Sequence, residues 1–284
     1  MKQILGDNQF FGINHHDLNK GDLTKRKFNT NKSIYKFIIE ATELGLDGFM
    51  MNSNARGFDI VDKNTFPEDI EIHYSIPYPH KFASIVNESG MMQLLSYTFR
   101  QISFKSISYK LFLFALTRDI RYAVSFISDL EIPKTLPKGS YVYLQNIVTD
   151  LILGLDRPDL LVEFCNTIQS KGFKPGLISF NPLILDKELQ NLSPLIKQDL
   201  IVCFNINKTG FNVFPSKEKV QTFINKVKDY QLMGMSILSS GGVSSIRESI
   251  DFIKTLDLDY VVYGSSKLRN IQSNIEYFAE DSKF

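Results

Sequence analysis

The feature that most constrains the fold is an alternation, along most of the chain, between short apolar β-rich runs and helical patterns. Strands that alternate with helices in this way are typical of βαβ units with parallel strands. Eight runs are strand candidates, at residues 3–5, 48–51, 70–76, 141–144, 176–180, 200–204, 236–240 and 259–263. Eight parallel strands are the number that closes a barrel, so the sequence predicts an α/β fold, a (β/α)8 TIM barrel.

The length of the chain favours one domain. It has 284 residues, 43% of them hydrophobic, which is enough for one barrel-sized core, so we expect a single domain over residues 1–284. Residues 90–138 interrupt the alternation and predict a helical insertion after the third strand. Four interpretations of this insertion are open: a lid, a dimer surface, a membrane-surface helix, or an ordinary helical elaboration packed on the barrel. The last is favoured, because a charged stripe is usually the solvated face of a helix.

Charge and cysteine usage exclude several classes of protein. The net charge is +1, whereas nucleic-acid binding requires a basic excess, so no nucleic acid is expected as a partner. The two cysteines, Cys165 and Cys203, lie far apart in apolar segments, which favours reduced thiols and a cytoplasmic protein. We expect no signal peptide, no transmembrane segment and no metal site.

Two glycine turns near the C-terminus predict a phosphate site. Each of the last two strand candidates ends in small residues, Ser240-Gly241-Gly242 and Gly264-Ser265-Ser266, and is followed by a helix. Glycines let an anion approach the backbone, and a helix N-terminus favours negative charge. The loops after strands 7 and 8 of such barrels often bind phosphate. The alternative is that both segments are plain strand-to-helix turns.

The other strand ends supply the remaining candidate site residues. In this architecture the active site lies at the carboxyl ends of the strands. The ends are rich in side-chain amides, which suit the binding of substrate hydroxyls, and poor in carboxylates, which argues against a two-carboxylate hydrolase. The candidates for substrate binding are Asn52, Gln145, Asn181, Asn205 and Asn207, and those for proton transfer are Asp7, His15 and His16.

Lys208, just past the sixth strand, is the candidate nucleophile. A desolvated lysine has a lowered pKa, and its free amine forms a Schiff base with a carbonyl compound. Two other interpretations remain open: the amine pairs with a bound phosphate as a point charge, or it stays solvated on a loop.

Three C-terminal segments resemble deoxyribose-phosphate aldolase and related class I aldolases. They are residues 207–211, 239–243 and 263–266. The resemblance implies a Schiff-base lysine close before a Thr-Gly turn and a phosphate site at the two glycine turns. When the Thr-Gly turns are superposed, however, the position of that lysine falls near Ile206 rather than Lys208.

A second resemblance is to the aldo-keto reductases. It rests on residues 261–266 with Asn274, on residues 4–6 with 11–12, and loosely on residues 48–57. The resemblance implies a nicotinamide dinucleotide phosphate at the end of the eighth strand. The family's catalytic tetrad is missing, because its aspartate after strand 2 is replaced by Asn52 and its strand-4 histidine by Gln145-Asn146. Residues 5–15 also resemble the opening of an uncharacterised bacterial barrel family.

These observations lead to one main hypothesis and two alternatives. The main hypothesis is an aldolase-like lyase that acts on a small phosphorylated carbonyl compound through Lys208. This hypothesis requires no cofactor, and it includes a homo-oligomer as one of the states of the protein. The first alternative is an NADPH-dependent oxidoreductase with a non-standard proton donor. The second is a non-catalytic barrel that binds a partner.

Overall fold

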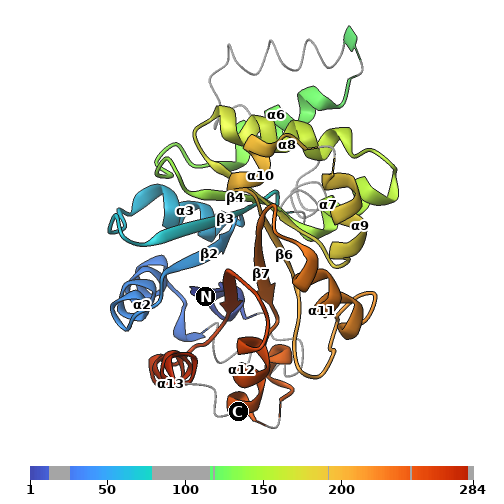
Figure 1. Cartoon of the computed structure of the whole chain (residues 1–284). Coiled ribbons are helices and arrows are strands. Elements are labelled where there is room, and N and C mark those ends of the chain that lie inside the picture. The colour runs from blue at the N-terminus through green and yellow to red at the C-terminus, as the bar shows by residue number, and fades with distance from the viewer. Residues whose placement is uncertain (13–25, 79–115, 118, 191, 244, 281–284) are drawn as a thin grey trace.

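The protein is a closed barrel of eight parallel strands surrounded by helices (Figure 1). The computed structural model describes residues 1–12, 26–78, 116–117, 119–190, 192–243 and 245–280. The strands pair in chain order and β8 pairs with β1, which confirms the predicted (β/α)8 barrel. They are β1 (Lys2–Leu5), β2 (Gly48–Asn52), β3 (Glu71–Ile76), β4 (Tyr141–Leu144), β5 (Lys174–Ile178), β6 (Ile201–Asn205), β7 (Gln231–Met235) and β8 (Tyr260–Tyr263).

Helices follow the strands, and several begin at side chains that cap them. The hydroxyls of Thr30, Ser216 and Ser245 each accept a hydrogen bond from a backbone N–H in the first turn of the helix that follows. The helices are α2 (Asn31–Glu43), α3 (Ala55–Lys63), α6 (Arg121–Glu131), α7 (Asn146–Gly154), α8 (Asp159–Ser170), α9 (Pro182–Leu189), α10 (Pro194–Asp199), α11 (Lys217–Lys226), α12 (Ile246–Lys254) and α13 (Leu268–Ala279), with 3-10 turns η1 (Asn8–Phe11) and η2 (Ser239–Gly241).

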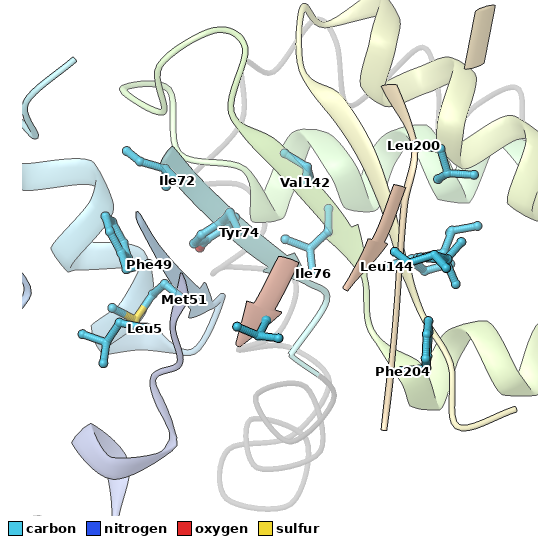
Figure 2. Close-up of a cluster of buried hydrophobic side chains, with 14 of the residues drawn as sticks. Leu5, Phe49, Met51, Ile72, Tyr74, Ile76, Val142, Leu144, Leu200 and Phe204 are labelled. Atoms are coloured by element: carbon cyan, nitrogen blue, oxygen red, sulfur yellow. The ribbon is translucent and has the colours of Figure 1, made fainter. Parts of the chain in front are cut away.

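Alternation along each strand divides the core into two parts. Successive side chains of a strand point to opposite faces. One part includes Leu5, Met51 and Phe204 and packs between the strands and the helices (Figure 2). The other fills the barrel interior and includes Ile4, Met50, Tyr143, Cys203 and Met233. The barrel is therefore a packed core and not a pore.

The seventh strand begins five residues before its predicted position. The sequence placed it at residues 236–240, but β7 ends at Met235. Ser236 adopts a φ of 56°, which ends the extended backbone of the strand. Ile237 lies in the turn that follows, and its apolar side chain is buried. A buried loop was therefore mistaken for a strand.

Only part of the predicted insertion is described. Between β3 and β4 the described elements include α6, which packs against α8, whereas most of residues 90–138 lie outside the described residues. The bounds of the insertion, and the single domain over residues 1–284, stay predictions. Within the described part of the chain, no helix combines the length and the apolar character needed to cross a bilayer.

A polar cluster closes the amino-terminal end of the barrel interior. His73 is fully buried, with its Nδ1 2.8 Å from the Tyr143 hydroxyl and its Nε2 3.5 Å from Oε2 of Glu71. The Tyr141 ring stacks on the His73 ring with centroids 4.8 Å apart, and Lys2 pairs with Glu71. This layer, the barrel floor, joins β1, β3 and β4.

The barrel floor predicts a loss of stability in acid. Burial lowers the pKa of His73, Glu71 raises it, and Lys2 and Lys174 lower it further. The unfolded chain binds a proton at His73 near pH 6.5 while the folded protein does not, so the contribution of His73 to the free energy of unfolding falls as the pH drops below 6.5. Asp7, whose pKa is raised in the folded protein to about 6, contributes with the opposite sign below pH 6. The expected slope is at most about 1.4 kcal/mol per pH unit. Urea unfolding from pH 8 to pH 5 measures it, and His73→Gln should remove this component. An unchanged slope in the variant contradicts the prediction.

Candidate active site at the barrel mouth

Asp7 is a buried carboxylate at the carboxyl end of β1. It is only 4% exposed, and its two oxygens accept hydrogen bonds from the backbone N–H and the side-chain Nδ2 of Asn52, both at 2.8 Å. Burial raises the pKa of Asp7 and the Asn52 hydrogen bonds lower it, with a net value of about 6. Asp7 therefore gains and loses a proton close to neutral pH, as a general acid must.

Asp7 belongs to a hydrogen-bonded chain that joins three strand ends. Oδ1 of Asn52 accepts a hydrogen bond from Nε2 of Gln145 at 2.5 Å, and the backbone N–H of Gln145 donates to Ile76 O at 2.9 Å. Both donors that Asn52 directs at Asp7 suit an ionised carboxylate, which only accepts. The amide orientation of Asn52 is thus fixed from both sides by Asp7 and Gln145.

Tyr78 is a second proton-bearing group beside Asp7. It follows β3, and burial raises its pKa, as does the negative charge of Asp7. A phenol with a raised pKa remains protonated at neutral pH and donates a hydrogen bond. Tyr78 was not among the site residues predicted from the sequence. Its position two residues beyond the end of a strand was the signal that could have identified it.

The two glycine turns follow neighbouring strands, but the turn at residues 240–242 begins five residues after β7 ends at Met235 and not directly at the strand end. Met233 and Gly234 of β7 are in register with Tyr260 and Val261 of β8. Gly241 has a φ of 90°, and a Cβ atom there would meet nothing within 4 Å, so its backbone borders open space. Gly264 differs, because a Cβ atom there would lie 2.4 Å from Oε1 of Gln9. Gly242 and Gly264 are exposed, and Ser265 and Ser266 are half-buried. The side chain of Ser240 lies outside those that the structure describes.

Three of the predicted substrate-binding amides are used by the protein itself. Asn181 caps α9, with Oδ1 accepting from Ile184 N. Nδ2 of Asn205 donates to Asn212 O at 2.9 Å, and Nδ2 of Asn207 donates to Phe211 O at 2.9 Å. These contacts shape the loops after β5 and β6. His15 lies outside the described residues.

Lys208 does not have the environment of a Schiff-base amine. Its side chain is 48% exposed, and its Nζ pairs with Glu248 at the start of α12. Desolvation is what would free the amine, and neither exposure nor a paired carboxylate supplies it. Among the described residues, no group of three or more His, Cys, Asp or Glu side chains could hold a metal ion.

The comparisons with known proteins identify the fold class. No family model and no curated protein matches the chain. Among solved structures, a protein from Pseudomonas aeruginosa assigned to the aldo-keto reductases is 13% identical, with a TM-score of 0.59, over 98% of this chain and 89% of its own. A thermostable aldo-keto reductase solved with the inhibitor epalrestat is 9% identical over 98% and 90%, with a TM-score of 0.56. The holo form of an aldo-keto reductase from Bacillus halodurans is 12% identical over 90% and 84%, with a TM-score of 0.56. At these identities the likeness shows a shared fold.

These neighbours correct the main hypothesis. They are aldo-keto reductases and not aldolases, so the prediction of a Schiff-base lyase is wrong, in agreement with the exposed, paired amine of Lys208. The expectation of a protein without a cofactor is corrected on the same ground, because one of these aldo-keto reductases was solved in its holo form, with a cofactor bound.

Proposed function

We propose that this protein is an oxidoreductase that reduces a carbonyl compound with a nicotinamide dinucleotide, NADPH, and that Asp7 is its proton donor. The observation that carries the proposal is the buried Asp7 carboxyl at the barrel mouth, whose pKa is raised to about 6. The aldo-keto reductase neighbours, which share the barrel, support the same class of reaction.

The residues at the β7 and β8 ends fit the phosphates of such a cofactor. Gly241 borders open space, and Gly242 and Gly264 are exposed, whereas Oε1 of Gln9 occupies the place that a side chain at position 264 would take. We assign phosphate binding to the segment 240–242 and to Gly264, Ser265 and Ser266. When bound, the cofactor supplies the hydride that reduces the carbonyl carbon.

Side chains at the barrel mouth transfer the proton that the carbonyl oxygen receives. Protonated Asp7 donates its proton to the carbonyl oxygen as the alcohol forms, and Asn52 stabilises the resulting carboxylate with its two hydrogen bonds. Gln145 holds the Asn52 amide in the orientation that this requires. Tyr78 donates a hydrogen bond to the substrate oxygen, so Asp7 and Tyr78 together replace the missing tetrad.

Binding of NADPH is expected to stabilise the folded protein. A ligand at 100 times its Kd that binds only the native state adds about 2.7 kcal/mol. Thermal unfolding with and without NADPH measures this effect, and NADPH oxidation in the presence of a panel of aldehydes and ketones measures the reaction. A melting temperature that NADPH leaves unchanged contradicts the proposal.

A further inference from the structure

A buried contact between α6 and the end of β2 joins the described part of the predicted insertion to the barrel. Ser53 follows directly after the last residue of β2, and its hydroxyl donates a hydrogen bond to Oε2 of Glu131, the last residue of α6. Both side chains are fully buried. A buried carboxyl group destabilises a protein unless it is hydrogen-bonded, so the contact fixes the positions of these two residues relative to each other.

Asn52 and Ser53 are held on opposite sides of the strand end. Successive side chains of a strand point to opposite faces. Asn52 therefore reaches Asp7 and Gln145 at the barrel mouth, whereas Ser53 reaches α6 outside the barrel. The backbone N–H of Ser53 also donates to Ser75 O of β3 at 3.0 Å, and α3 begins two residues later. The contact with α6 thus lies where the strand ladder gives way to the helix.

A second contact ties the same segment to the other end of α3. Oγ1 of Thr135, four residues beyond α6, donates to Asp62 O at 3.0 Å in the last turn of α3. Helix α6 itself packs against α8 (Figure 1), and Asp129 of α6 pairs with Lys171 at the carboxyl end of α8. Residues 131–135 therefore hold both ends of the segment between Ser53 and Asp62 against a helix that is fixed in turn by α8.

We propose that Glu131 is a positioning residue for Asp7 and acts through Ser53 and Asn52. From outside β2, Glu131 keeps the strand end in the place where the backbone N–H and Nδ2 of Asn52 both point at the Asp7 carboxylate. Support of this kind matters because a displacement of about 1 Å lowers the rate of a catalysed reaction by about 100-fold. The inference rests on the proposed role of Asp7 as proton donor, and it gives α6 a part in the reaction.

The ionisation of Asp7, followed by carbon-13 NMR of protein labelled at the aspartate carboxyl carbons, tests the proposal without requiring catalysis. The resonance is assigned by its absence from Asp7→Asn, and in the unmodified protein it should titrate near pH 6. Tyr78, whose raised pKa reflects the charge of Asp7, stays protonated over this range. Ser53→Ala removes the donor to Glu131 and displaces Asn52, whose weakened hydrogen bonds stabilise the ionised carboxylate less. We expect the inflection to rise by about 0.5 pH unit or more.

Two variants of α6 are the controls. Glu131→Gln is the conservative change, because it retains an oxygen that accepts from the Ser53 hydroxyl, and its inflection should stay within about 0.2 pH unit of that of the unmodified protein. Asp129→Asn breaks the ion pair of the same helix with Lys171, and it should lower the melting temperature without moving the inflection.

Equal inflections in Ser53→Ala and the unmodified protein overturn the proposal, and so does an equal rise in Asp129→Asn. Melting temperatures verify that the variants fold, and Glu131→Asp, which is one methylene shorter, takes the place of Ser53→Ala if that variant does not.

Steady-state kinetics supply a second readout. Ser53→Ala should lower kcat for carbonyl reduction by about tenfold or more and leave KM for NADPH unchanged, because Ser53 acts on the proton donor and not on the cofactor. A raised inflection in a protein that reduces no carbonyl compound supports the positioning of Asp7 and contradicts the proposed function, so the two failures are distinguishable.

Discussion

Replacing Asp7 with asparagine is expected to lower kcat/KM for carbonyl reduction by about 10²–10⁴-fold, the usual contribution of a general acid. Asparagine has the same shape but cannot give up a proton at neutral pH. The asparagine side chain has one acceptor oxygen where aspartate has two. The backbone N–H and Nδ2 of Asn52, which each donate to one oxygen of Asp7, would therefore share one acceptor and face an NH2 group. Steady-state NADPH oxidation by wild type and variant measures the loss.

If Asp7 is the proton donor, the rate of reduction must change with pH in a definite direction. Reduction requires protonated Asp7, so its rate is expected to be high below pH 6 and to fall as the pH rises through about 6. Oxidation of the alcohol requires the ionised form, and its rate should rise over the same interval. A reduction profile without an inflection near pH 6 contradicts the assignment.

Asp150 is the matched control for Asp7. Its carboxylate also accepts one side-chain and one backbone hydrogen bond, from Ser179 Oγ at 2.6 Å and from Phe180 N at 3.0 Å. These contacts hold the turn after β5. Asp150→Asn should therefore lower the melting temperature while kcat/KM stays within a few-fold of wild type. If both variants lose activity equally, the loss reflects disturbed packing and not a missing proton donor.

Replacing Gly57 with alanine is expected to destabilise the protein by about 3 kcal/mol. A Cβ atom at this position of α3 would lie 2.1 Å from the backbone oxygen of Asn52 and 3.0 Å from Cγ of Met51. A backbone atom cannot move aside as a flexible side chain does, so α3 must shift away from β2. Urea unfolding measures the change, and activity should fall with it, because Asn52 holds Asp7.

Gly154→Ala is the control for this substitution. Gly154 is also helical, at the end of α7, but a Cβ atom there would meet nothing within 4 Å. Alanine restricts the unfolded chain more than glycine does, so this variant should gain about 0.5 kcal/mol. Equal effects of the two substitutions would contradict the steric explanation.

The sequence predicted the barrel because each buried parallel strand produces an apolar run that helices separate. It predicted Asp7, Asn52 and Gln145 as candidates for the same reason, since they directly follow three such runs. It could not show that the three side chains form one hydrogen-bonded chain, because that contact depends on strand register. The seventh strand was misplaced because Ile237 is as buried in a turn as a strand residue would be, so the apolar run alone does not distinguish the two.

The assignment of a Schiff base to Lys208 failed for a physical reason. Lys208 was selected for its position after β6, but position in the chain does not determine whether a side chain is desolvated, and here it reaches Glu248. Asn205, the last residue of β6, and Asn207 just beyond it donate hydrogen bonds to the backbone of the loop that follows, and their role in substrate binding stays a prediction.

In the described part of the chain, the barrel floor closes the amino-terminal end of the packed barrel, so ligands approach from the carboxyl ends of the strands. His73, Tyr141 and Tyr143 pack across the amino-terminal end, so two ligands that react at the other end share one route in and out. The ligand that lies deeper must then enter first and leave last. For the proposed reaction this means an obligatory order of addition, which product-inhibition patterns would reveal.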